Sequence, residues 1–73
     1  MSDLPRVSGA KAVKAFGRFG FQQARQVGSH AILKKENYPL LLSVPLHREM
    51  KPGTLRRLIR DAGITVEEFC KAL

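Results

Sequence analysis

The segment "FQQARQVGSHAILKK", residues 21–35, decides the fold because it has the pattern of two strands joined by a tight turn. Residues 21–27 alternate weakly between apolar and polar side chains, which favours a strand with one exposed face. The Gly-Ser pair at 28–29 interrupts this strand, and "HAILK" at 30–34 forms a second one. A further apolar run of strand length, "LLLSV" at 40–44, follows a polar turn. Three short strands separated by short turns predict an antiparallel meander.

Apolar residues at helical spacing occur in the sequence both before and after the predicted strands. Ser8 can cap a helix that runs to about Phe19, and Gly20 ends it. A second helix begins at Pro52, which suits a first helical position, and ends at Gly63. Both helices carry basic side chains away from their apolar stripes, so the stripes are free to cover one face of the sheet.

A third, short helix is indicated by two start signals at the same place. Thr65 and Glu68 have the spacing of a capping box, and Ile64 and Phe69 have the spacing of a hydrophobic staple. The expected buried face of this helix comprises Val66, Phe69, Cys70 and Leu73. The order α-β-β-β-α-α predicts an α+β fold, a three-stranded antiparallel sheet packed against helices, in one domain over residues 1–73.

The composition is that of a small globular domain and not of a disordered chain. The hydrophobic content is 44% over 73 residues. The single cysteine permits no intrachain disulfide and fits a reducing compartment. Residues 1–7 are polar and include Pro5, so we expect no signal peptide, and no run approaches the roughly 18 apolar residues of a membrane span. We therefore expect a cytoplasmic protein with no membrane partner.

Basic residues dominate the charge of the chain. Thirteen Lys and Arg against six Asp and Glu give a net charge of +7, and the sequence pI is about 10.4. Residues 4–35 contain basic side chains and no acid, and residues 48–60 set five basic side chains against Glu49 alone. This asymmetry indicates a polyanionic partner and favours nucleic acid over a basic surface that serves only solubility.

The motifs of several other functional classes are missing from the sequence. Gly17, Gly20 and Gly28 are too dispersed for a phosphate-binding loop, and no Gly-Lys-Ser/Thr follows them. Two histidines, one cysteine and scattered acids have no recognisable metal-ligand spacing, so we expect neither a metal nor a cofactor. Ser29 beside His30 is no evidence for a catalytic triad, because adjacent strand residues point to opposite faces.

A histidine in a basic field remains as the candidate for chemistry. His30 and Ile32 share one face of the predicted strand, and Ala31 and Leu33 share the other. Cleavage of RNA by its own 2′-hydroxyl requires a base, an acid and cations; histidine can be either base or acid, and Arg and Lys supply the cations. From the residues alone, however, a single histidine such as His30 favours an ordinary, exposed strand residue over a catalytic one. His47, which follows "VPL" in a loop, is a weaker candidate for catalysis than His30.

Four stretches, taken in order, resemble the HicA family of toxins, also called YcfA-like proteins. They are "LPRVSGAKAVKAFGRFGF" (4–21), "RQVGSHAIL" (25–33), "SVPLH" (43–47) and "MKPGTLRRLIRDAGITVEEF" (50–69). The resemblance covers nearly the whole chain, and its specificity comes from the ordered set more than from any one motif. The most telling pieces are Gly-Ser-His at 28–30, Lys-Pro-Gly-Thr-Leu at 51–55 and Ala-Gly-Ile at 62–64.

The resemblance implies a small fold like that of a double-stranded-RNA-binding domain, and the activity of a ribosome-independent mRNA interferase. It also implies a partner antitoxin, HicB, that neutralises the toxin and covers its catalytic histidine, which would be His30. We expect a monomer when free and a hetero-oligomer with the antitoxin. Many relatives have a second histidine or an arginine where this chain has Ala31, which should face away from His30. His47 matches a frequent Val-Pro-x-His pattern and is a secondary candidate, as an acid or an RNA contact.

Basic and hydroxyl side chains near these elements are the expected RNA contacts. Lys34 shares the face of His30 and could bind phosphate, and the other candidates are Lys11, Lys14, Ser29, Lys51, Arg56 and Arg57. Each of them could equally be part of a solvated face. Two alternatives to an endoribonuclease stay open, namely a non-catalytic module that binds RNA by shape and a pure interaction protein whose basic surface meets an acidic antitoxin.

Overall fold

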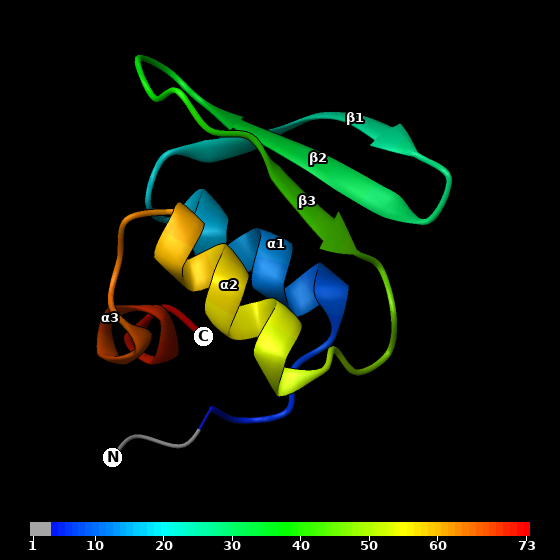
Figure 1. Ribbon diagram of the computed structural model, residues 1–73, viewed down its shortest axis with the longest axis vertical. Helices are drawn as coiled ribbons and strands as arrows, with labels where there is room; N and C mark the ends of the chain where they lie inside the picture. The colour runs from blue at the N-terminus through cyan, green and yellow to red at the C-terminus, as the bar shows by residue number, and fades with distance from the viewer. Residues whose placement is uncertain (1–3) are drawn as a thin grey trace.

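The computed structural model describes residues 4–73 and has the α-β-β-β-α-α order and the α+β class that the sequence predicts (Figure 1). Its elements in chain order are α1 (Gly9–Gly17), β1 (Phe21–Val27), β2 (His30–Lys35), β3 (Leu42–Pro45), α2 (Pro52–Asp61) and α3 (Val66–Lys71). The expectations for the signal-peptide region and for the domain start fall partly on residues 1–3, outside the described part. In residues 4–73, no helix combines the length and the apolar character needed to cross a membrane.

The sheet is an antiparallel meander with the strand order β1-β2-β3. The tight turn between β1 and β2 uses Gly28 at a φ of 58°, a conformation that glycine adopts without strain. At the turn end of the sheet, His30 is paired with Val27 on one side and with Pro45 on the other. The register of β1 shifts at Ala24, which has no Cα partner on β2, so β1 carries a β-bulge there.

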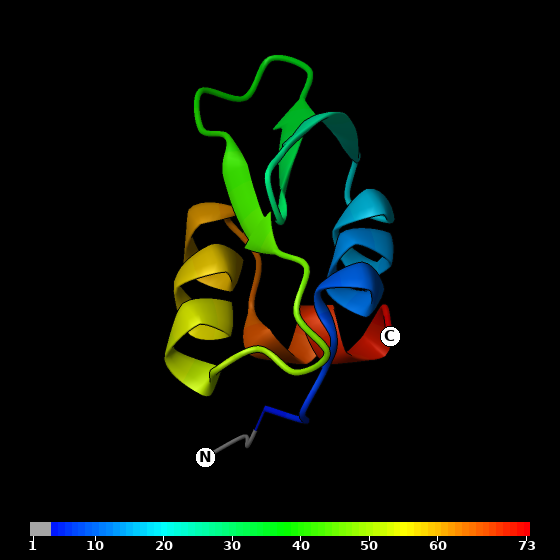
Figure 2. The ribbon, with the colours of Figure 1, turned by 90° about the vertical axis from the view of Figure 1, so that its right-hand side faces the viewer.

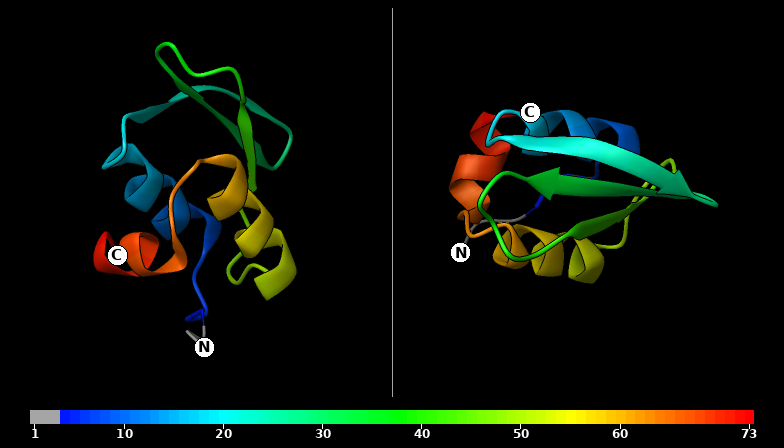
Figure 3. Two further views of the ribbon diagram at one scale, coloured as in Figure 1. Left: turned by 60° about the vertical axis from the view of Figure 1, so that its left-hand side comes forward. Right: turned by 90° about the horizontal axis from the view of Figure 1, so that it is seen from above.

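The two faces of β2 differ as the alternation predicts. Ala31 and Leu33 are fully buried against the helices, whereas His30 and Lys34 are exposed on the outer face. Figure 2 shows α1 and α2 side by side beneath the sheet, with α3 across the end that lies away from the strands. In the view from above, the strands lie nearest the viewer and the helices lie behind them (Figure 3). The outer face of the sheet is therefore left open to carry a site.

Aromatic side chains join the helices to the sheet in the core. Phe16 of α1 lies 5.1 Å from Phe69 of α3 between ring centroids and 6.2 Å from Phe21 of β1, and all three are almost completely buried. Tyr38, in the connection from β2 to β3, packs edge-on against Phe21, and its hydroxyl donates a hydrogen bond to the carbonyl of Asp61 at the end of α2. The core thus links the long connection to both layers.

Two element boundaries differ from the sequence-based expectations. Helix α1 ends at Gly17, before Phe19, because the next three residues form a tight turn whose N–H groups donate to carbonyls three residues back. The strand expected at 40–44 is Leu42–Pro45 instead, and Leu40 and Leu41 are 46% and 58% exposed in the connection.

Helix α3 has the predicted capping box and a shorter buried face than expected. The hydroxyl of Thr65 accepts from the N–H of Glu68, and the carboxylate of Glu68 accepts from the N–H of Thr65. Phe69 is fully buried, and Val66 and Cys70 are half-buried. The expectation that Leu73 is buried is wrong: α3 ends at Lys71, and Leu73 is 48% exposed beyond the last turn of this helix.

Candidate active site

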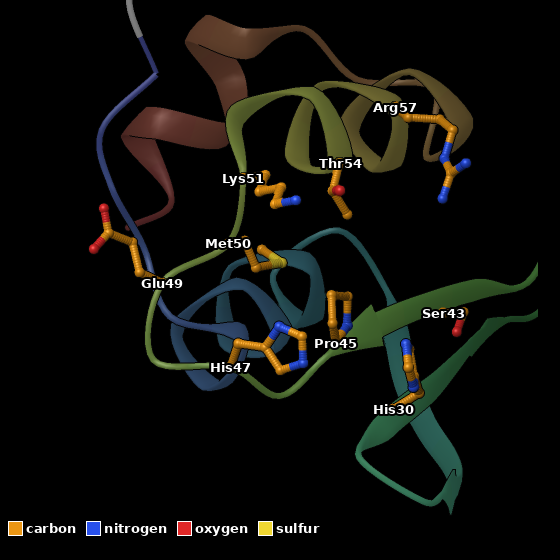
Figure 4. Close-up of a pocket in the computed structure, with 9 residues that line it drawn as sticks. All are labelled: His30, Ser43, Pro45, His47, Glu49, Met50, Lys51, Thr54 and Arg57. Atoms are coloured by element: carbon orange, nitrogen blue, oxygen red, sulfur yellow. The ribbon is translucent and has the colours of Figure 1, made fainter.

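A cavity of about 400 Å³ opens where the sheet meets the beginning of α2 (Figure 4). This volume lies within the range of small-molecule and cofactor pockets, about 300–1,000 Å³. The lining side chains come from β2, β3, the loop after β3 and the first two turns of α2. They are His30, Ser43, Pro45, His47, Glu49, Met50, Lys51, Thr54 and Arg57. We call this cavity the histidine pocket.

The two histidines of the chain lie next to each other in the pocket. The ring centroids of His30 and His47 are 6.5 Å apart and the ring planes meet at 64°. Their neighbours in sequence hold them there, because the N–H of Leu46 donates a hydrogen bond of 2.7 Å to the carbonyl of Ser29. The residue that precedes His47 is thus hydrogen-bonded to the residue that precedes His30. No pattern in the sequence indicates that the two histidines are close together.

Helix α1 fixes the position of His47 from the other side. The N–H of Gly9 donates to the carbonyl of His47 at 2.9 Å, and the N–H of Met50 donates to the carbonyl of Val7 at 2.9 Å. Gly9 packs directly on this loop, since a Cβ at that position would lie 2.1 Å from the carbonyl oxygen of Pro45 and 2.8 Å from the Cα of Leu46. Residues 45–50 are therefore held by backbone contacts to α1 and to the β1–β2 turn.

Helix α2 contributes three side chains to the pocket at a spacing of three residues. Lys51, Thr54 and Arg57 lie along the side of its first two turns that faces the sheet, and Figure 4 shows Arg57 extending from the helix toward the strands. Lys51 and Arg57 are exposed. The first turn of α2 has no acidic residue and no side-chain cap, so its backbone N–H groups favour an anion. The α2 side of the pocket is therefore suited to phosphate.

The acidic side chain of the pocket does not face the histidines. Glu49 forms an ion pair of 3.0 Å with Arg6, and both side chains are exposed. In Figure 4 its carboxylate points away from His30 and His47. Because Arg6 balances Glu49, Lys51 and Arg57 determine the sign of the charge near the two imidazoles, which is positive.

The other expected RNA contacts lie outside the histidine pocket. Lys34 is on the outer face of β2 with His30, but it lines a second cavity beside the bulge of β1. Ser29 is exposed in the β1–β2 turn. Lys11 and Lys14 are exposed on α1, and Arg56 is exposed on α2 next to Arg57. Of the seven expected contacts, the structure thus brings only Lys51 and Arg57 together with the histidines.

Besides Glu49, sequence reasoning missed the two hydroxyl side chains of the pocket. Thr54 could have been found from its place midway between Lys51 and Arg57, because residues three apart lie on one face of a helix. Ser43 is the polar residue of an otherwise apolar strand, and it is paired with Ile32 on the outer face. A polar residue that interrupts an apolar run at the outward position of a strand is the signal that would have indicated it.

The polar side chains of the pocket lie over an apolar core, to which the lining residue Met50 belongs. In the part of the chain that the structure describes, no polar or charged residue is buried, and no buried side-chain nitrogen or oxygen lacks a hydrogen-bond partner. Within residues 4–73, no three His, Cys, Asp or Glu side chains gather as a metal-binding group. The polar side chains of the pocket can therefore be changed one at a time without opening the core, whereas Met50 is itself part of the core.

Comparison with known proteins assigns the chain to one protein family. No curated protein has a significant match to the chain. A family model described as the HicA toxin of bacterial toxin-antitoxin systems matches residues 9–64. The match begins at the glycine that packs against the His47 loop and extends past α2, so it includes every residue of the histidine pocket. The chain therefore belongs to the family of HicA toxins of bacterial toxin–antitoxin systems.

Proposed function

We propose that this toxin is a metal-independent endoribonuclease that cleaves mRNA, with His30 as an acid/base group. The observation that carries the proposal is the histidine pocket itself, where two exposed imidazoles lie 6.5 Å apart beside Lys51 and Arg57. Histidine can accept or donate a proton near neutral pH, and neighbouring cations stabilise the negative charge that develops on a phosphate under attack. Membership in a toxin family supports a destructive activity of this kind.

The position of the pocket suits a single RNA strand. It opens between the outer-face residues His30 and Ser43 and the start of α2, so a flexible strand can lie across it. We assign Lys51 and Arg57 to the phosphate being cleaved. The basic residues outside the pocket would bind flanking phosphates through screened electrostatic contacts, with Ser29 as a hydroxyl donor near the turn. These outer residues are Lys11, Lys14, Lys34 and Arg56.

We further propose that the antitoxin is HicB-like and covers the histidine pocket. A toxin–antitoxin family implies an antitoxin partner, and an exposed pocket is blocked most directly by a chain seated over it. The free toxin would be a monomer in the cytoplasm, and binding of the antitoxin would produce a hetero-oligomer in which His30 is inaccessible to RNA.

The products of the reaction test the proposed chemistry. In the presence of a chelator, the purified protein is expected to cut RNA and leave a 2′,3′-cyclic phosphate on one fragment and a 5′-hydroxyl on the other. The same sequence with 2′-O-methyl groups, or as DNA, is expected to stay intact because it has no free 2′-hydroxyl to attack the phosphate. End-group analysis by mass spectrometry gives the answer. Intact RNA after prolonged incubation, or 5′-phosphate ends, would contradict the proposal.

Two arginines of α2 provide a matched test of the pocket. Arg57→Ala is expected to lower kcat/KM for RNA cleavage by about 10–100-fold. This is less than the roughly 10²–10³-fold loss caused by removing an enclosed oxyanion donor, because Arg57 is exposed. Arg60→Ala removes the same charge from the same helix outside the pocket, and a small change is expected. Equal losses in the two variants, measured at one salt concentration, would mean that only net charge matters.

A further inference from the structure

We propose that His47 is the second proton-transfer group of the site, so that His30 and His47 act as an acid–base pair on one phosphodiester. The inference rests on the proposed ribonuclease function and extends it, because that function requires one proton to be removed and another to be supplied. The sequence resemblance implies a catalytic role for His30 and leaves His47 as a secondary candidate, as an acid or an RNA contact. The assignment of His47 comes from its position beside His30 in the folded chain.

The distance between the rings fits a phosphate placed between them. A centroid separation of 6.5 Å is too long for a direct hydrogen bond between the imidazoles. It leaves room for each ring to come within about 2.6–3.2 Å of a different oxygen of an intervening group, the reach required of a general acid or base. Both side chains are exposed, and within residues 4–73 neither has a side-chain hydrogen-bond partner. Both imidazoles are therefore available to a substrate.

The cations approach the same space from another direction. Figure 4 shows His30 on the sheet and His47 on the loop after β3, with Lys51, Thr54 and Arg57 on the α2 side. A phosphate between the histidines would present its bridging oxygens to the rings and its non-bridging oxygens to α2. Charge that builds up on the non-bridging oxygens is then opposite the ammonium and guanidinium groups that can stabilise it.

The backbone holds the two histidines as one unit. The hydrogen bond from Leu46 to Ser29 joins the residues that immediately precede them, and the bond from Gly9 to the carbonyl of His47 anchors the loop to α1. Neither bond involves a histidine side chain. The imidazoles are thus placed by the fold through backbone bonds, and their ring nitrogens are left for the substrate.

The proposed step balances in protons and bonds. One histidine, neutral, takes the proton of the 2′-hydroxyl while the 2′ oxygen forms a bond to phosphorus. The bond from phosphorus to the 5′ oxygen breaks, and the other histidine, protonated, gives its proton to that leaving oxygen. The products are a 2′,3′-cyclic phosphate and a 5′-hydroxyl. The two histidines end with exchanged protonation states, and proton exchange with solvent restores them before the next turnover.

A substrate with sulfur in place of the bridging 5′ oxygen separates the two roles. A thiolate leaves without being protonated, so this substrate bypasses the acid but still needs the base. On ordinary RNA, His30→Ala and His47→Ala are each expected to lose about 10²–10⁴-fold in kcat. On the sulfur substrate, one of the two variants is expected to return to near the wild-type rate while the other stays slow. The variant that is rescued identifies the acid.

The pH dependence gives a second readout that a structural role would not produce. The wild-type rate is expected to rise and then fall with pH, because one histidine must be neutral and the other protonated. Each single variant is expected to lose one limb of this profile. Arg48→Ala is the matched control, since Arg48 is exposed, follows His47 in the same loop and does not line the pocket. It is expected to keep both limbs and the ability to cleave the ordinary substrate.

The outcomes separate this inference from the function on which it rests. If wild-type protein leaves RNA intact, the ribonuclease proposal itself fails. If wild type cleaves RNA and His47→Ala keeps its rate and both limbs, the pair is overturned while the role of His30 stands. Loss of activity in both variants with no rescue by sulfur would also overturn the pair, and would assign His47 to binding. His47→Gln, with a thermal melt of each variant, verifies that the loop remains folded.

Discussion

His30→Ala is expected to lower kcat for RNA cleavage by about 10²–10⁴-fold, the usual contribution of a general acid or base. The side chain lies at the rim of the histidine pocket, where it can reach a bound phosphate, and alanine offers no group that can transfer a proton. Cleavage of a labelled oligoribonucleotide, followed over time under single-turnover conditions, measures the chemical step directly.

The same substitution is expected to leave folding and RNA affinity nearly unchanged. His30 is exposed, and its strand is paired on both sides through the backbone, so the free energy of unfolding should change by no more than about 0.5 kcal/mol. His30→Gln, which keeps a polar side chain of similar size, is the companion variant. Full activity in either variant would exclude His30 from catalysis. A wild-type protein that binds RNA with a steep salt dependence and cleaves nothing would instead be a binding module.

Gly9→Ala is expected to be the most disruptive single-methyl change in the chain. The added Cβ would lie 2.1 Å from the carbonyl oxygen of Pro45, and both the helix and the loop meet at this point through backbone atoms. Neither side can move a flexible side chain out of the way, so we expect a destabilisation of about 1–3 kcal/mol or more. For a domain of this size, each kcal/mol lowers the melting temperature by about 4–8 °C.

Activity should fall with stability, because the displaced loop carries His47. A misplacement of about 1 Å in a catalytic group can cost around 10²-fold in rate. Gly17→Ala is the matched control at the other end of α1, where no atom lies within 4 Å of the added Cβ. It is expected to stabilise the protein by about 0.4–1 kcal/mol, because alanine has less conformational freedom in the unfolded chain. Equal melting temperatures for the two variants would contradict the proposed packing of Gly9.

Much of the fold could be predicted because its signals are local. The Gly-Ser turn, the alternation from His30 to Lys34 and the capping box at Thr65 each depend on residues a few positions apart. The alternation also placed His30 and Lys34 on the open face of the sheet. The alternation does not say how far apart two residues on that face lie. In the structure, Lys34 is too far along β2 to line the histidine pocket and lines a second cavity instead.

The proximity of the two histidines could not be predicted because it depends on long-range backbone contacts. The hydrogen bonds from Leu46 to Ser29 and from Gly9 to His47 join backbone N–H and carbonyl groups. Every residue carries these groups, except that proline has no N–H, so no side-chain pattern indicates such bonds. The close packing of Gly9 cannot be predicted from the sequence either, because a glycine after Ser8 is simply compatible with the start of a helix. The path of residues 45–50 therefore had to come from the structure.

In residues 4–73 no charged or polar residue is buried in the core, and this has a genetic consequence. One substitution at His30 would remove the proposed cleavage while the remaining surface, including the rest of the pocket, keeps its shape. A gene copy with such a change would still produce a folded protein that occupies the antitoxin. Inherited beside an intact toxin gene, it would act as a decoy that raises the amount of antitoxin the cell needs.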